Sequence, residues 1–233
     1  MFKISFLLKS KASIYCILIF LITKIKNIFI KRKIIDFKKK HQSLIRKKII
    51  TNDYFSSHAY NFFFFLKKLN SNFDYLEIGS YEGNSAIFVA TNFENAKIDC
   101  IDNWNKTEDY QNHKDFKNIE ENFDMNVKNF KNIKKFKVSS DEFFFENKKK
   151  YDVIYVDGYH HASQVYKDCK NAWSALNNGG YLICDDYIWN FYENIEDNPC
   201  FAINQFLSET NDYFKIKKIS NSQIFVKKIS SKD

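Results

Sequence analysis

Hydrophobic and polar positions along residues 70–228 follow two alternating patterns. Short apolar runs predict strands, and the stretches between them predict helices because their apolar residues recur every three or four positions. The run at 151–156 (YDVIYV) is apolar enough to be buried on both faces of a sheet. The expected strands are 73–78, 97–101, 133–138, 151–156, 181–184, 213–219 and 223–228, and the expected helices are 60–69, 85–91, 109–127, 141–147, 162–176 and 201–209.

This order of elements predicts an α/β fold. Five strand–helix units followed by a hairpin around 220–222 indicate a Rossmann-like, mostly parallel seven-stranded sheet, with helices on both faces and a terminal antiparallel hairpin. We expect the helix over 162–176 to end in a left-handed turn at Asn177-Asn178-Gly179-Gly180. The length of 233 residues suits one domain, which we place at 51–233, with an N-terminal helical extension at 1–50.

The extension is both apolar and basic. Residues 12–22 are uncharged and apolar, yet well short of the roughly 20 residues that span a bilayer as a helix. Residues 1–50 hold 14 Lys and Arg against one acid, Asp36, whereas the remaining residues hold 22 basic and 27 acidic side chains. We expect a helical extension that packs on the domain or on a second copy of the chain, as in a homo-oligomer. The alternative is a helix that makes a peripheral contact with an anionic membrane face.

Charge and cysteine usage narrow the class of protein. A nucleic-acid enzyme tends to carry positive charge around its cleft, but the predicted domain is mildly acidic, so we expect no nucleic-acid partner. The five cysteines form no CxxC pair and no cluster with zinc-ligand spacing. Scattered thiols of this kind are typical of a reducing compartment, and we expect a cytoplasmic protein, in contact with a membrane surface if the extension binds one.

The ends of the first two strands suit an adenosine-bearing ligand. The first strand leads through Glu77 to Gly79 and Gly83, which let the chain turn tightly and bring backbone amides against a ligand. The loop lacks the middle glycine of the dinucleotide fingerprint, and no Gly-Lys-Ser/Thr follows as in a P-loop. The second strand ends at Asp102, 25 residues after Glu77, where an acid can accept both hydroxyls of a ribose.

Three carboxylates follow the fourth and fifth strands. Asp157 follows one strand, and Asp185 and Asp186 follow the other. Carboxylates that converge at one edge of a sheet repel one another unless a cation or protons neutralise them, and oxygen ligands suit Mg²⁺, Ca²⁺ or Mn²⁺. The alternative is that Asp185 or Asp186 only caps the turn that follows.

Two histidines stand beside this cluster. His160 is a candidate for proton abstraction because the pKa of histidine lies near neutral pH. The alternative is that one histidine caps the helix near Ala162 and the other is exposed. Tyr187 and Trp189 either floor a substrate pocket or pack in the core.

Residues 72–190 resemble the class I S-adenosylmethionine-dependent methyltransferases. Within that class they are similar to the macrolide-sugar and aminocoumarin-sugar O-methyltransferases. The stretches that carry the resemblance are FDYLEIGSYEGNS, KIDCIDNW, YDVIYVDGYHHASQVYKD and LNNGGYLICDDY.

The resemblance implies a cofactor, a metal and roles for named residues. S-adenosylmethionine would be bordered by the first loop, its ribose held by Asp102 and its adenine contacted after the third strand. A divalent ion, usually Mg²⁺, would bind the acceptor hydroxyl, with Asp157 and His160 as catalytic residues. Some relatives place an acidic base at the position of Tyr159, so His160 is the substitute here. The implied cofactor contacts are Glu77, Gly79, Ser80, Gly83, Asn84, Ser85, Asp102, Ser140, Asp141 and Asp157, and the implied metal ligands are Asp157, Asp185 and Asp186.

The leading hypothesis is therefore a metal-assisted O-methyltransferase acting on a hydroxyl of a sugar, glycan or small metabolite. Two alternatives stay open: a nucleotide-dependent oxidoreductase on the same sheet, and a non-catalytic adenosine-binding scaffold. A nucleic-acid methyltransferase is disfavoured, because no Asn-Pro-Pro-Tyr-type motif is present.

Overall fold

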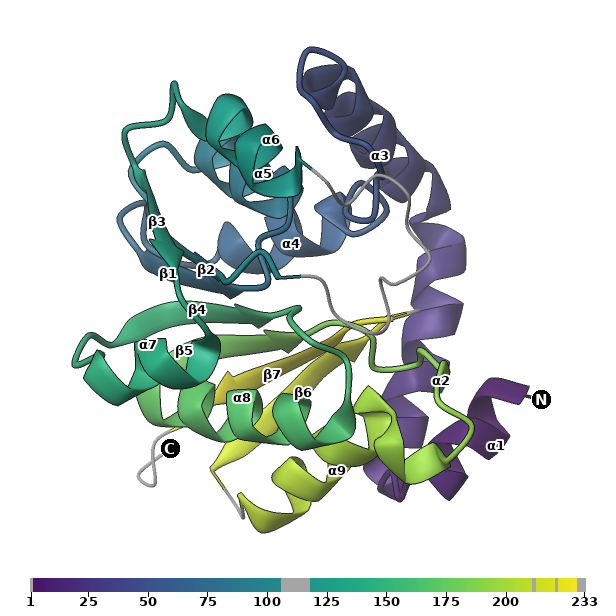
Figure 1. The fold of residues 1–233 in the computed structure, drawn as a ribbon. Coiled ribbons are helices and arrows are strands. Elements are labelled where there is room, and N and C mark those ends of the chain that lie inside the picture. Colours follow the sequence, from purple (N-terminus) through teal and green to yellow (C-terminus); the bar gives the residue numbers. More distant parts are fainter. Residues whose placement is uncertain (1, 106–117, 211–212, 221, 230–233) are drawn as a thin grey trace. The chain divides into compact units, whose positions relative to one another are not determined.

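The computed structural model describes residues 2–105, 118–210, 213–220 and 222–229 (Figure 1). Its strands form one seven-stranded sheet in the order β3-β2-β1-β4-β5-β7-β6. β1 pairs with β2, β2 with β3 and β4 with β5 in parallel, whereas β7 is antiparallel to both β5 and β6. The predicted α/β fold, with a mostly parallel sheet and a terminal antiparallel hairpin, is confirmed. The strands are β1 Asp74–Ile78, β2 Lys97–Asp102, β3 Ile133–Lys137, β4 Tyr151–Val156, β5 Leu176–Cys184, β6 Phe214–Ile219 and β7 Ile224–Lys228.

The chain divides into two compact units, residues 1–26 with 140–233, and residues 27–139. Among its described residues, the unit of residues 27–139 holds β1 to β3 and the four helices α3 to α6. Its core is apolar and aromatic, with Phe62, Leu76 and Ile87 fully buried. The expected helix over 109–127 is described only from Ile119, since 106–117 lie outside the described residues. The four helices are α3 Lys31–Ile45, α4 Ala59–Leu66, α5 Asn84–Asn92 and α6 Ile119–Val127.

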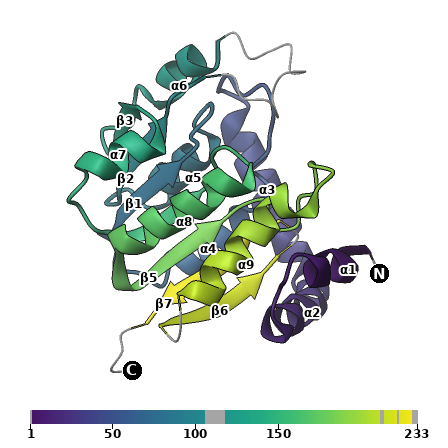
Figure 2. The ribbon, with the colours of Figure 1, turned by 60° about the horizontal axis from the view of Figure 1, so that its bottom comes forward.

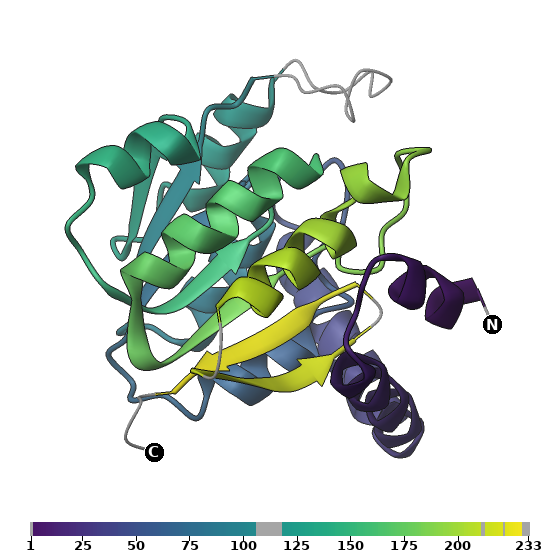
Figure 3. The same cartoon turned by 90° about the horizontal axis from the view of Figure 1, so that it is seen from below.

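The other unit holds β4 to β7. Helices α8 and α9 pack against each other on one face of these strands (Figures 2 and 3). Helix α9 begins with Pro199, which fits the first turn because no partner is needed there for the missing N–H. The helical elements are α1 Phe2–Lys9, α2 Ile14–Phe29 (whose last three residues belong to residues 27–139), α7 Ser140–Glu146, α8 Ala162–Ala175, the short 3-10 helix η3 Ile195–Asp197 and α9 Pro199–Glu209.

The predicted left-handed stop of α8 is wrong, although the helix ends within one residue of the expected position. The helix ends at Ala175, and Leu176 is already extended and begins β5. The left-handed residue is Gly179, with a φ of 82°, inside the irregular start of that strand. The last helical carbonyls do not need a left-handed cap, because Lys228 Nζ of β7 donates to the carbonyl oxygens of Trp173 and Leu176 at 2.7 and 3.0 Å.

The N-terminal extension forms three helices, α1, α2 and α3. The apolar run at 12–22 falls mainly in α2, as expected for a helix. Within the described part of the chain, no helix is both long and apolar enough to cross a membrane.

Candidate functional site

The loop between β1 and α5 has an unusual backbone. Three alternate residues, Gly79, Tyr81 and Gly83, have φ values of 86°, 48° and 81°. Glycine adopts this left-handed conformation freely, but tyrosine does so only under strain. The Tyr81 backbone is held on both sides: its N–H donates to Asp102 Oδ2 at 2.9 Å, and its carbonyl accepts from Trp104 Nε1 at 2.9 Å. Backbone strain that neighbouring residues hold in place is typical of functional loops.

Glu77, at the end of β1, is fully buried in the same unit. Its Oε2 accepts from the Tyr75 hydroxyl at 3.0 Å, but Oε1 has no hydrogen-bond partner in the described part of the chain. Burial raises the pKa of Glu77 to about 7; the Asp102 carboxyl adds to the rise, whereas the hydroxyls of Ser85, Tyr75 and Ser80 oppose it. A buried acceptor without a partner is costly, and a ligand that brings a donor would satisfy it.

Asp102, at the end of β2, is oriented by backbone amides. Its Oδ1 accepts from Trp104 N at 2.7 Å and its Oδ2 from Tyr81 N at 2.9 Å. Burial raises the pKa of this carboxyl, and the backbone N–H groups oppose the rise. Each carboxylate oxygen keeps a second lone pair, so the group can still accept from two ribose hydroxyls.

The start of α5 is tied to α3. His41 Nε2 donates to Asn84 Oδ1 at 2.7 Å, and Asn84 Nδ2 donates to Asp53 Oδ1 at 3.2 Å. Burial lowers the pKa of His41, which favours the neutral imidazole. The Asn84 amide, predicted to border the cofactor, is therefore also a link to the N-terminal extension. Sequence reasoning missed His41 and Asp53, and no spacing or motif pointed to them.

Glu82 anchors the same loop from its other side. The buried carboxylate accepts from Thr51 N at 2.7 Å, from the Thr51 hydroxyl at 3.0 Å and from Asn122 Nδ2 at 2.8 Å. Asn126 of α6 donates to the Glu82 carbonyl and forms two bonds with the backbone of Ile49. Sequence reasoning gave these residues no role. They hold the glycine-containing loop in one conformation.

Ser140 and Asp141, the predicted adenine contacts, begin α7 in the other unit. The Ser140 hydroxyl donates to Asp168 Oδ1 at 2.6 Å, and Gln164 Nε2 contacts Ser140, Asp141 and Asp168. Burial raises the pKa of Asp168 to about 6, while Ser140 and Gln164 oppose the rise. The side chain of Ser140 is thus engaged with α8, and its contact with adenine stays a prediction.

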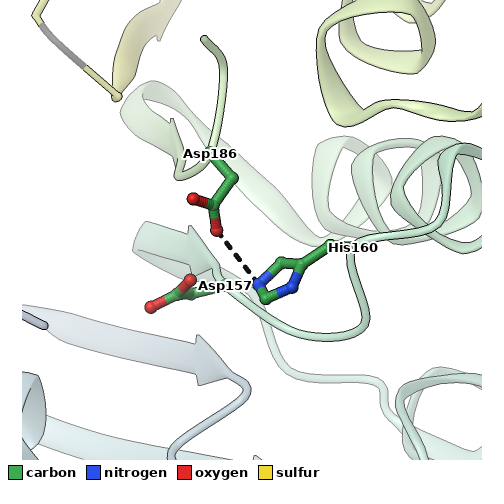
Figure 4. A group of neighbouring side chains, drawn as sticks. All are labelled: Asp157, His160 and Asp186. Atoms are coloured by element: carbon green, nitrogen blue, oxygen red, sulfur yellow. Dashed lines mark ion pairs between the residues drawn. The ribbon is translucent and has the colours of Figure 1, made fainter. Parts of the chain in front are cut away.

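Three side chains meet where β4 and β5 end. One potential ligand atom each from Asp157, His160 and Asp186 lies within 4.8 Å of the others, and His160 Nε2 is 3.0 Å from Asp186 Oδ2 (Figure 4). All three are partly buried. Two carboxylates and an imidazole are a suitable donor set for a divalent ion.

Asp185, the third predicted metal ligand, is not in this group of three. Its Oδ2 accepts from Gln223 Nε2 at 2.8 Å and from the Tyr155 hydroxyl, and its Oδ1 accepts from Asp186 N at 2.8 Å. This last bond resembles the turn-capping role weighed above. As a metal ligand Asp185 stays a prediction.

The charge around Tyr155 has to be neutralised. Its single hydroxyl hydrogen faces two carboxylates, Asp157 Oδ2 at 2.8 Å and Asp185 Oδ2. Burial raises the pKa of Asp157 well above its usual range, Asp185 and Asp186 raise it further, and His160 opposes them. Because one hydroxyl cannot donate to both acids, one of them carries a proton or a cation lies nearby.

The neighbouring aromatic residues have different roles. His161 caps α8, where Ser163 N donates to its Nδ1 at 3.4 Å, so the capping alternative is confirmed for this histidine. Tyr187 is fully buried and bonds Asn204, which makes it a core residue. Trp189 lies beside His160, with 4.8 Å between ring centroids, and Phe191 stacks on Trp189 at 5.0 Å.

Comparison with known proteins shows which proteins this domain is similar to. Residues 76–187 match the model of a methyltransferase domain family. The O-methyltransferase TomG from Streptomyces achromogenes, solved with S-adenosylmethionine, matches with a TM-score of 0.60 at 10% identity, covering 83% of this chain and 89% of its own. A Klebsiella pneumoniae protein described as a candidate O-methyltransferase matches with a TM-score of 0.58 at 10% identity, covering 89% of this chain and 97% of its own.

A third similar structure is the methyltransferase MycE of the mycinamycin biosynthetic pathway, solved with Mg, S-adenosylhomocysteine and mycinamycin VI. It gives a TM-score of 0.56 at 13% identity and covers 83% of this chain and 54% of its own. A comparison with curated proteins gives no match. Residues 76–187 are therefore similar to a methyltransferase domain, and the chain has the fold of the methyltransferase structures that it matches.

Proposed function

We propose that this protein transfers a methyl group from S-adenosylmethionine to a hydroxyl of a sugar, glycan or small metabolite, assisted by a divalent ion. The observation that carries the proposal is the grouping of Asp157, His160 and Asp186 where β4 and β5 end, within the methyltransferase domain. Ligands of open α/β sheets bind at the carboxyl ends of the strands.

The residues of the β1–α5 loop fit the cofactor. Glu77 Oε1 is a buried acceptor that lacks a partner among the described residues, and it suits the ammonium group of the methionine part. Asp102 is held by two backbone amides and suits the two ribose hydroxyls. The TomG and MycE structures, which hold S-adenosylmethionine and S-adenosylhomocysteine, support this choice of cofactor.

The acid cluster fits a divalent ion. Asp157 and Asp186 would hold Mg²⁺ or Mn²⁺, with either His160 or Asp185 as the third protein ligand. When bound, the ion supplies Lewis acidity that lowers the pKa of a coordinated hydroxyl. The Mg in the MycE structure supports the proposal.

His160 is the proposed base. Its Nε2 lies 3.0 Å from Asp186 Oδ2, and this contact orients the ring. Some sugar O-methyltransferases carry an acid at the position of Tyr159. Here the Tyr159 ring stacks on that of His161, with 6.1 Å between ring centroids. His160 is thus the basic group next to Asp157 and Asp186.

The aromatic side chains beside the cluster support a ring-shaped acceptor. Trp189 and Phe191 stack almost parallel, with 2° between their planes, and Phe191 is largely exposed. Aromatic faces bind the C–H faces of sugar rings and flat metabolites while leaving hydroxyls free to react.

The first test is isothermal titration of the full chain with S-adenosylmethionine, with and without Mg²⁺. We expect Asp102→Ala to abolish binding and Asp124→Ala, which removes an exposed carboxyl of the same unit, to leave it intact. Preference for a nicotinamide dinucleotide would favour the oxidoreductase, and absence of binding under both conditions would overturn the proposal.

The second test is release of S-adenosylhomocysteine from a panel of sugar, glycan and metabolite acceptors. Asp157→Asn and Asp186→Asn should lose metal-dependent activity, whereas the exposed control Glu196→Gln should keep it. Loss of Mn²⁺ binding in His160→Ala but not in Asp185→Asn would assign His160 as a ligand. A scaffold would bind the cofactor and show no turnover with any acceptor.

A further inference from the structure

Helix α2 presents an apolar face to solvent. The exposed residues recur at the spacing of one helical face, so they form a continuous stripe. Leu18 and Ile25, near its middle, are 51% and 58% exposed. We name this surface the α2 stripe; its members are Ile14, Leu18, Leu21, Ile22, Ile25, Ile28 and Phe29.

The opposite face of α2 is the one that packs on the protein. Cys16, Phe20 and Thr23 are buried there. The Tyr15 hydroxyl donates to the Ile216 carbonyl of β6 at 3.4 Å, and the helix lies beside this strand (Figure 3). The α2 stripe therefore does not belong to the core. Contiguous exposed apolar residues of this kind mark a contact surface.

The charges around the stripe identify what it contacts. On a helical wheel Lys24 and Lys26 fall outside its two opposite borders, where their ammonium groups can reach the plane of lipid phosphates. Residues 1–35 contain eight Lys and Arg and no acid. Each such charge near an anionic bilayer adds about 1 kcal/mol of attraction.

A second copy of the chain is a poorer partner for the same face. An isologous pair of α2 stripes would bring two basic surfaces together without an acid from residues 1–35 to offset them. A helix that crosses the bilayer is also not available among the described residues.

We infer that the α2 stripe is a membrane-binding surface, by which α2 lies in the plane of an anionic lipid face. The apolar side chains enter the boundary between headgroups and acyl chains, and the flanking lysines contact lipid phosphates. This inference goes beyond the proposed methyl transfer and does not depend on it.

The test is flotation of the full chain with vesicles, without S-adenosylmethionine. Wild-type protein should float with vesicles of phosphatidylglycerol and phosphatidylcholine in equal parts, and much less with phosphatidylcholine alone. Leu18→Glu with Ile25→Glu should reduce the partition coefficient at least about tenfold. Lys24→Gln with Lys26→Gln should reduce it by a similar factor, and only on the anionic vesicles.

The control is Phe145→Glu with Met125→Glu, which adds the same two charges at apolar residues of α7 and α6 that are 86% and 51% exposed. Circular dichroism confirms that each variant is folded. Equal flotation of wild type and of the α2 variants would overturn the inference, as would absence of wild-type flotation. A dimer that Leu18→Glu with Ile25→Glu converts to monomer, without vesicle binding, would assign the stripe to self-association instead.

Discussion

Glu77→Gln should stabilise the protein, and more so at high pH. The carboxyl is fully buried and its pKa is raised to about 7 from 4.5, so ionising it in the folded state is unfavourable. For an acid with a raised folded-state pKa, stability is highest below the unfolded pKa and falls as pH rises toward the folded one. This rise in pKa lowers the free energy of unfolding of the wild type by about 3 kcal/mol, and the full loss is reached above about pH 7. Glutamine keeps the acceptor for Tyr75 and does not ionise.

Urea unfolding at about pH 5 and about pH 8.5 measures this directly, because constant effects of the substitution cancel between the two conditions. The advantage of Glu77→Gln over wild type should grow by about 2–3 kcal/mol across that range. Glu146→Gln, at an exposed site, should show no such growth. If wild type and Glu77→Gln keep the same pH dependence, Glu77 is not ionised at a cost in the folded protein and the reasoning fails. The variant should also bind S-adenosylmethionine more weakly, as expected when a residue is kept for function at the expense of stability.

Three further substitutions test other contacts. Gly83→Ala should lower the free energy of unfolding by about 1–2 kcal/mol, because the added Cβ meets Phe123 at 3.1 Å and the φ is 81°; thermal unfolding measures it. Asn126→Ala removes the hydrogen bonds to Ile49 and Glu82 and should lower the free energy of unfolding by about 2–3 kcal/mol, as measured with urea. The control Asn105→Ala, at an exposed residue, should leave it unchanged. Burial raises the pKa of Asp168 to about 6, so the free energy of unfolding of Asp168→Asn should exceed that of wild type by up to about 3 kcal/mol as pH rises from about 4 past 6. An equal difference in melting temperature at low and high pH would contradict this.

The sheet was predictable because its central strands are short apolar runs and its lysine-rich strands β3 and β6 alternate apolar and polar residues. The way in which α8 ends was not, because Lys228, which donates to the carbonyls of Trp173 and Leu176, lies more than fifty positions away on β7. The contact between His41 and Asn84 spans 43 positions and has no local signature.

The acid cluster was foreseen only in part. Successive residues of an extended chain point to opposite sides, so Asp185 and Asp186 cannot easily face one point. Asp185 turns to Tyr155 and Gln223, and Asp186, with a left-handed φ of 54°, turns to His160. The order of strands predicted that these aspartates lie at one edge of the sheet, but which side chains contact one another depends on the backbone conformation at each residue.

All five cysteines are buried free thiols, which makes the protein convenient for site-specific labelling. Buried thiols react slowly with maleimides, so the wild-type cysteines need not be replaced. A cysteine introduced at Ile25 of α2 would be the single accessible thiol, and an environment-sensitive fluorophore attached there would report the polarity around that helix in the otherwise unmodified chain.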